Sequence, residues 1–154
     1  MSDWKRQTRE VTLETLPREM ASAIQWHIEQ YNLGPILSEA LMYIQTDSEK
    51  LKKGLFDSAE IVQMAAIVTP RWLVWSVDEP GKNAAVLLAQ LIHVTVQDYA
   101  QTPFAKMVPD SGVQVNGMFT DAGESASAFI EADEGTAGQK FRQILIKAAV
   151  DAKK

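Results

Sequence analysis

The chain has 154 residues and a formal net charge of −5, and it contains no cysteine. This length fits one domain, which can bury roughly 70% of the surface that its unfolded form exposes. The negative charge disfavours nucleic acid, which needs a concentrated basic face, and argues against adhesion to anionic membranes. The absence of cysteine excludes disulfides, zinc–thiolate sites and thiol nucleophiles.

The first 14 residues are mostly polar and lack the apolar core and cleavage site of a secretory signal. Val11 and Leu13 are their only aliphatic residues, so this segment is predicted to be partly disordered. No stretch supplies the roughly 20 uncharged apolar residues that cross a bilayer. The closest, 84–96, is too short and is interrupted by polar residues. The sequence therefore predicts a cytoplasmic protein.

An amphipathic helix is predicted from about Leu16 to Leu33. Its apolar or partly apolar positions recur at spacings of three and four: Met20, Ile24, His27, Ile28 and Tyr31. Pro17 lies near the start, where its missing N–H has no helical partner to lose. The sequence Asn32-Leu33-Gly34-Pro35 ends the helix.

From Ile36 to Ala132 the periodicity is that of β-strands separated by turn-forming residues. The predicted strands are 40–48, 59–69, 71–77, 84–97 with room for an internal bend, 104–108, 113–119 and 125–132. Consecutive strands on short turns form an antiparallel meander. Segments 62–68 and 84–88 are apolar on both faces, which indicates that the N-terminal helix covers the outside of the sheet there.

The last predicted element is an amphipathic helix from Thr136 to about Lys153. One of its faces carries Phe141, Ile144, Leu145 and Ala148. Thr136 and Gln139 have the three-residue spacing of a capping box at its start. Such a stripe must be buried against a sheet or across the open end of a barrel, so the predicted fold class is α+β.

Three segments resemble parts of the pleckstrin-homology-like (PH-like) domains, in particular the bacterial and GRAM-type ones. Residues 68–75, Val-Thr-Pro-Arg-Trp-Leu-Val-Trp, are similar to their T-x-x-R-L-hydrophobic strand pair. Residues 110–115 resemble their late hairpin, and residues 137–149 look like their closing helix.

The resemblance covers residues 37–152. It implies an antiparallel barrel of about seven strands closed by the C-terminal helix. Residues 36–154 would form this barrel and helix, and residues 1–35 would be a polar segment and an extra amphipathic helix packed on it. The shared motifs are folding signals without catalytic content.

The residues that could carry chemistry favour no catalytic or metal site. His27 lies on the packed face of its helix and is predicted to be a partly buried histidine rather than a general base. His93 lies on the polar face of a strand, and no H-E-x-x-H spacing exists. Trp72 and Trp75 should point to opposite faces of their strand, one into the core and the other toward the covering helix or solvent. The prediction is no enzyme, no cofactor and no metal.

One basic segment stands out, formed by Lys50, Lys52 and Lys53 between the first two predicted strands. In eukaryotic PH domains this turn binds phosphoinositide headgroups, so the resemblance implies a ligand site here. No K-x-R follows Lys53, so the bidentate arginine grip on phosphate is missing, and a solvated hairpin tip is the other interpretation. Trp26 lies on the flank of its helix, where it contacts a partner or edges the core.

Three functions remain. The favoured one is a non-catalytic binding or assembly module with a protein partner, or an oligomer if the N-terminal helix docks on another copy. The second is a lipid or phosphate headgroup binder through the Lys50 to Lys53 loop. The third is a small cone-shaped α+β enzyme with a pocket lined by His27, His93 and tryptophans; the terminal helix argues against it, since such enzymes generally end in strands.

Overall fold

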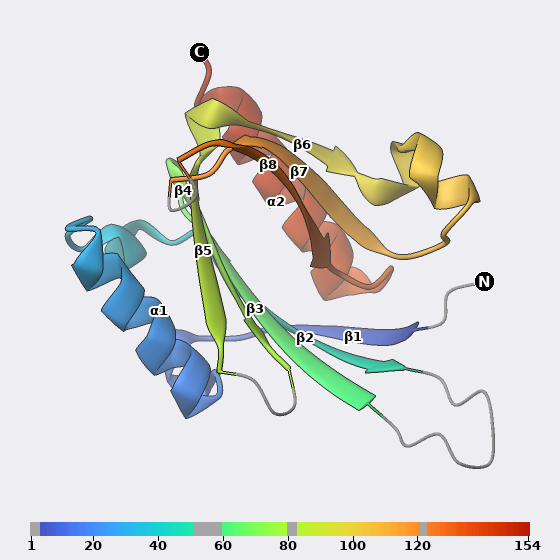
Figure 1. Cartoon of the computed structure of the whole chain (residues 1–154), viewed down its shortest axis with the longest axis horizontal. Helices are drawn as coiled ribbons and strands as arrows, with labels where there is room; N and C mark the ends of the chain where they lie inside the picture. The colour runs from blue at the N-terminus through green and yellow to red at the C-terminus, as the bar shows by residue number, and fades with distance from the viewer. Residues whose placement is uncertain (1–3, 51–59, 80–82, 121–122) are drawn as a thin grey trace.

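The computed structural model describes residues 4–50, 60–79, 83–120 and 123–154. Within these ranges the chain forms two antiparallel sheets and two long helices (Figure 1). The first sheet has the strand order β1-β2-β3-β4-β5, and the second has the order β6-β7-β8. The predicted α+β class with a C-terminal helix is confirmed. The described strands remain two separate sheets and are not hydrogen-bonded into one closed barrel.

The first sheet consists of β1 (Trp4–Glu10), β2 (Met42–Lys50), β3 (Glu60–Val68), β4 (Trp72–Asp78) and β5 (Ala85–Gln90). The second consists of β6 (Val94–Asp98), β7 (Gly112–Met118) and β8 (Ser125–Glu131). The long helices are α1 (Arg18–Gln30) and α2 (Thr136–Asp151). Short 3-10 helices are η1 (Leu13–Thr15), η2 (Ile36–Glu39), η3 (Leu91–His93), η4 (Tyr99–Gln101) and η5 (Pro103–Lys106). No helix in the described ranges is both long and apolar enough to cross a membrane.

The predicted disorder of the N-terminal segment is wrong. Residues 4–10 form strand β1, which pairs with β2 along its whole length. Its inward side chains are polar: Arg6 Nη1 donates to Ser48 Oγ at 2.6 Å, and the Thr8 and Thr46 hydroxyls lie 2.9 Å apart. These hydrogen bonds replace the apolar contacts that ordinarily mark a strand in a sequence.

The predicted strand at 104–108 is also wrong, because this segment contains η5 and a turn. Pro103 begins the 3-10 helix and Pro109 follows it, and neither can donate to a strand ladder. The predicted bend within 84–97 is confirmed, since η3 separates β5 from β6.

The capping box predicted for α2 does not form. The N-cap is Gly135, and Gln139 Nε2 donates instead to Glu134 Oε2 at 2.8 Å. Gly138 has a separate role, because a Cβ there would lie 2.1 Å from the Asp133 carbonyl oxygen. Only glycine allows the first turn of α2 to approach the end of β8 so closely.

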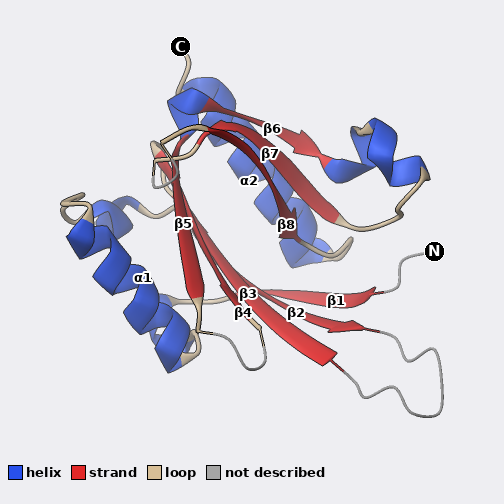
Figure 2. Cartoon of the chain, viewed as in Figure 1, coloured by secondary structure: helices blue, strands red, loops and turns tan. Residues whose placement is uncertain are grey.

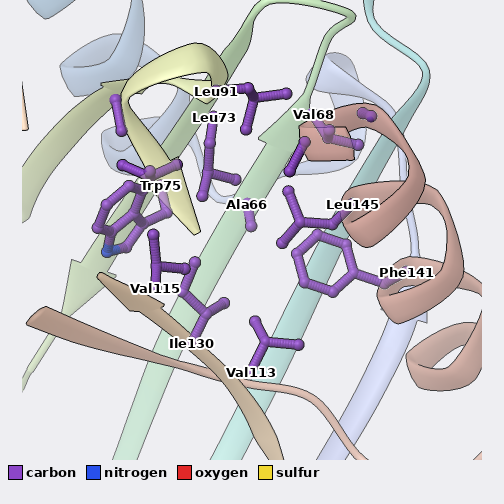
Figure 3. Close-up of a cluster of buried hydrophobic side chains, with 14 of the residues drawn as sticks. Ala66, Val68, Leu73, Trp75, Leu91, Val113, Val115, Ile130, Phe141 and Leu145 are labelled. Carbon is purple, nitrogen blue, oxygen red and sulfur yellow. The ribbon is translucent and has the colours of Figure 1, made fainter. Parts of the chain in front are cut away.

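The main core lies between the two sheets and α2 (Figure 3). Phe141 and Leu145 of α2 are fully buried, and Trp75 of β4 meets Phe119 edge-on with 5.5 Å between ring centroids. Trp72 lies on the opposite face of β4 and packs toward α1, as the spacing of the two tryptophans predicts. This core fixes α2 across the open side between the sheets.

A second apolar layer lies on the other face of the first sheet, where α1 covers it (Figure 2). Met20, Ile24 and Ile28 of α1 pack with Ala65, Ile67, Val74 and Leu88 of β3, β4 and β5. The helix therefore docks on its own chain, as the doubly apolar segments predict. Trp26 points away from this layer and is 61% exposed.

Candidate functional site

A groove of about 760 Å³ lies at one end of the first sheet, beside the C-terminal half of α2. Its walls are mainly apolar and come from segments far apart in sequence: Leu41, Pro70, Trp72, Ile92, Ala148 and Ala152. Gln90 and the charged Arg71, Lys147 and Asp151 complete the lining. Concave apolar surfaces with a few polar groups are the usual form of ligand sites in proteins.

The sheet side of the groove is held by the turn between β3 and β4. Thr69 Oγ1 accepts hydrogen bonds from the backbone N–H groups of Arg71 at 3.2 Å and Trp72 at 2.9 Å. Leu91 N donates to the Arg71 carbonyl oxygen at 2.8 Å, which ties η3 to this turn. The groove wall is therefore built from bonded backbone rather than from a free loop.

The helix side is fixed by Lys153. Its Nζ donates to the carbonyl oxygens of Leu91 and Ala149, each at 2.9 Å. The side chain thus satisfies a carbonyl near the end of α2 and links the helix to η3. This link joins the end of α2, which carries the lining residue Asp151, to η3, which carries the lining residue Ile92.

The groove rim carries more positive than negative charge, although the whole chain is acidic. Asp151 is bonded to Lys147 Nζ at 2.6 Å and lies 3.2 Å from Lys154 Nζ. Hydrogen bonds from these lysines lower the pKa of Asp151. Arg71 is exposed and has no ion-pair partner among the described residues. The groove therefore offers apolar contacts and positive charge, and no nucleophile paired with a base.

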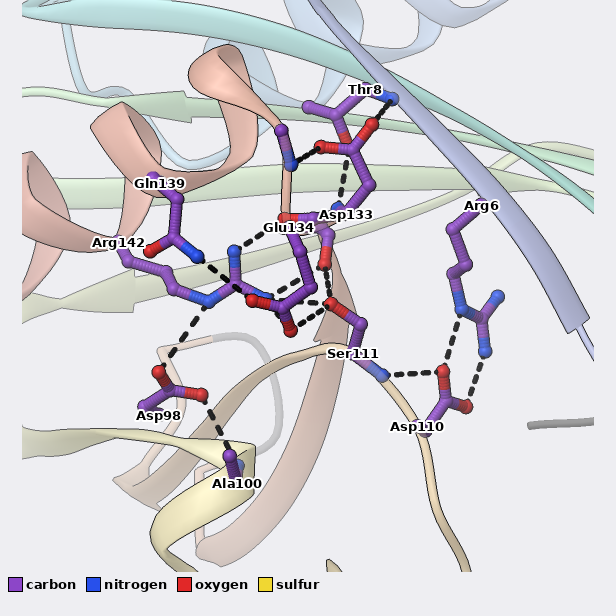
Figure 4. A network of polar contacts seen from close by, with 12 residues as sticks. Arg6, Thr8, Asp98, Ala100, Asp110, Ser111, Asp133, Glu134, Gln139 and Arg142 are labelled. Atoms are coloured by element: carbon purple, nitrogen blue, oxygen red, sulfur yellow. Dashed lines mark hydrogen bonds and ion pairs between the residues drawn. The ribbon is translucent and has the colours of Figure 1, made fainter. Parts of the chain in front are cut away.

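A smaller pocket of about 290 Å³ lies between the two sheets at the end of β8. It is lined by Trp4, Arg6, Val62, Val77, Glu79 and Glu131. Asp110 holds Arg6 by two hydrogen bonds, Nε to Oδ1 at 2.9 Å and Nη2 to Oδ2 at 2.6 Å (Figure 4). Burial raises the pKa of Glu131. The positive charge of Arg6 lowers this pKa, whereas the negative charges of Asp110 and Glu79 raise it.

Glu131→Gln should make the free energy of unfolding less dependent on pH. Because the folded state raises the pKa of Glu131, it binds that proton more tightly than the unfolded state does. Wild-type stability should fall as pH rises from the ordinary glutamate range through the raised value, and the variant should lack this fall. Urea unfolding from about pH 4 to 8 measures the difference.

The matched control is Glu124→Gln, at an exposed position between β7 and β8. It should keep the wild-type pH profile. Parallel profiles for wild type and Glu131→Gln would show that this carboxyl has the same proton affinity in the folded and unfolded chain.

A polar network joins the start of α2 to the second sheet (Figure 4). The buried Arg142 donates to the carbonyl oxygens of Asp133 at 2.5 Å and Ala132 at 2.8 Å, and to Ser111 Oγ at 2.8 Å. Asp133 in turn accepts from the Thr8 backbone N–H at 2.8 Å, which connects β1. This network is architectural, and the only sequence signal for it is that Arg142 lies three positions before the core residue Leu145.

The ligand site at Lys50, Lys52 and Lys53 stays a prediction. Lys50 is exposed at the end of β2, opposite Trp4 in the strand register. Lys52 and Lys53 lie outside the described residues. Trp26 is exposed on the outer side of α1 and lines neither pocket described above, so its partner contact stays a prediction.

The two histidines lie on different elements and line neither pocket. His27 is half-buried on α1, with its ring centroid 5.0 Å from that of Tyr31. His93 is exposed in η3. Among the described residues, no group of three or more histidine, cysteine, aspartate or glutamate side chains is placed to hold a metal ion.

No protein-family model, curated protein or solved structure matches this chain.

Proposed function

We propose that the chain is a non-catalytic, PH-like binding module whose groove holds an apolar segment of a partner protein with acidic flanks. The observation that carries this proposal is the apolar groove with its positively charged rim on a chain of net charge −5. An apolar floor supplies affinity by removing surface from water, and the rim selects and steers a partner of opposite charge.

The order of β2 to β8 followed by α2 supports the PH-like part of the proposal. Four of these strands lie in the first sheet and three in the second, and α2 packs across the open side between them. Strand β1 and helix α1 are additions to that pattern. They enlarge the first sheet and cover its outer face.

A partner protein suits the groove better than a second copy of this chain. The most exposed apolar segment of the described chain, around Met107, carries Lys106 as its own charge. Lys106 would meet the like charges of Arg71 and Lys147 in the groove. An acidic segment meets these groups with attraction, and its affinity should fall as salt screens the rim.

Calorimetric titration with two synthetic peptides tests the proposal. One peptide places two leucines and a phenylalanine between glutamates, and the other has lysines in place of the glutamates. We expect saturable binding of the glutamate-flanked peptide that weakens with salt, and weaker or no binding of the lysine-flanked peptide.

The variant Ile92→Glu places a carboxylate in the groove and should lower the affinity at least tenfold. Ile61→Glu is the matched control, because Ile61 is 52% exposed and Ile92 is 54% exposed, and Ile61 does not line the groove. Equal affinities for both peptides, or equal losses in both variants, would contradict the proposal. If the free protein instead forms larger species as its concentration rises, and Ile92→Glu abolishes them, the groove is a self-association surface.

A further inference from the structure

The most exposed large apolar side chains among the described residues lie together in one loop. Met107 is 83% exposed, Phe104 65% and Val108 63%. They belong to residues 103–109, which we call the apolar loop, between β6 and β7. In Figure 1 this loop projects from the second sheet on the side away from α1. Folding alone does not account for three such side chains in water at one projecting tip.

The apolar loop is held from inside by polar contacts. Tyr99 is buried, and its hydroxyl donates to the Val108 carbonyl oxygen at 2.6 Å. Its ring meets the ring of Phe129 edge-on, with 5.0 Å between the centroids. Thr102 Oγ1 donates to the Tyr99 carbonyl oxygen at 2.7 Å. The Phe104 carbonyl oxygen accepts from the N–H groups of Met107 and Val108 at 3.0 and 2.8 Å. The outward display is therefore preorganised and loses little conformational entropy on binding.

The charges around the apolar loop leave it positive. Lys106 is the only charged side chain between Asp98 and Asp110, and it has no ion-pair partner among the described residues. Arg6 binds Asp110 at 2.6 Å, and Arg142 Nε lies 3.7 Å from Asp98. Both flanking acids are thus balanced by arginines inside the fold. The net charge of −5 still disfavours adhesion of the whole surface to an anionic membrane, so any attraction has to be local and come from Lys106 at the projecting tip.

The shape and size of the apolar loop indicate its partner. A stable protein interface buries about 1,200 Å² or more in total, which a tip of this size does not supply alone. A lipid bilayer needs no complementary surface, because each apolar side chain partitions into it separately. We propose that the apolar loop inserts reversibly into the interfacial region of an anionic bilayer, with Phe104, Met107 and Val108 in the apolar layer and Lys106 at the headgroups.

Sedimentation with vesicles tests this proposal on the full chain. One vesicle type is pure phosphatidylcholine, and the other contains about 30% phosphatidylserine. A single short loop binds weakly, so the lipid concentration must reach the millimolar range. We expect the protein to sediment with both types and more strongly with the anionic one. Met107→Ser and Phe104→Ser should each lower the partition coefficient about three- to tenfold.

Lys106→Gln should remove the preference for phosphatidylserine and leave binding to phosphatidylcholine intact. Trp26→Ser is the matched control, because Trp26 is as exposed as Phe104 but lies on α1. It should sediment like wild type. These variants change exposed side chains, so their urea unfolding should match that of wild type and separate partitioning from folding.

No sedimentation of the folded wild type at millimolar lipid would overturn the proposal, as would equal losses in Trp26→Ser and Phe104→Ser. If vesicles fail to bind and Phe104→Ser weakens binding of the glutamate-flanked peptide, the apolar loop is a protein contact instead. The groove can fail its own peptide test without affecting these results, since the apolar loop shares no residue with it.

Discussion

Replacing Phe141 by alanine is expected to lower the free energy of unfolding by about 3–5 kcal/mol, as for other emptied aromatic core sites. Phe141 is fully buried and lies with Leu145 between α2 and the strands of both sheets (Figure 3). The cavity left by the phenyl ring would border α2 and both sheets, which cannot all move inward to fill it. Urea unfolding followed by circular dichroism measures the loss.

The control for this change is Lys140→Ala, at the neighbouring position of α2. Lys140 Nζ lies 2.9 Å from Glu10 Oε1 in an exposed ion pair. Such pairs contribute about 0–1 kcal/mol, so this variant should unfold almost like wild type. Similar losses in the two variants would mean that α2 presents a different face to the core.

Arg142→Ala should also cost about 3–5 kcal/mol, the usual effect of removing one member of a buried polar network. The change would leave the carbonyl oxygen of Asp133 without its donor, and the carbonyl oxygen of Ala132 with the Ser111 hydroxyl alone. It would also loosen the junction at which β8 meets α2. Arg142→Lys should not restore stability, since one ammonium group cannot reproduce the planar fork that reaches several acceptors.

Arg9→Ala is the matched control for Arg142→Ala. Its guanidinium pairs with Asp47 at 2.9 Å on the surface, where ion pairs contribute little. Urea unfolding should therefore separate the two arginines by several kcal/mol. A loss at Arg142 no larger than the loss at Arg9 would contradict the architectural role of the network.

The parts of the fold that the sequence predicts are those with apolar periodicity. The apolar stripe of α1 must be buried, and so must the outer faces of the doubly apolar segments in β3 and β5. The helix and the strands bury one another. The stripe of α2 similarly identifies Phe141 and Leu145 as core residues. In both helices the signal is local and repeats every three or four positions.

The parts that the sequence does not predict depend on contacts between residues far apart in the chain, or on apolar side chains that are exposed instead of buried. Strand β1 is not predicted because the partners of Arg6 lie far away in the sequence. Ser48 is 42 residues from Arg6, and Asp110 is 104 residues from it. The apolar loop is taken for a strand because it contains Phe104, Met107 and Val108, which the structure exposes. The groove is not predicted either, since its lining comes from separate segments that share no local motif.

The most direct test of the groove as the binding surface is the indole N–H signal of Trp72 in a nitrogen-15 NMR spectrum. The chain has four tryptophans, and Trp72→Phe assigns this signal. Titration with the glutamate-flanked peptide should shift the Trp72 signal saturably and leave the Trp26 signal unchanged. In Ile92→Glu the same shift of the Trp72 signal should need at least tenfold more peptide. A saturable shift of Trp4 or Trp26 with an unmoved Trp72 would contradict the proposed function.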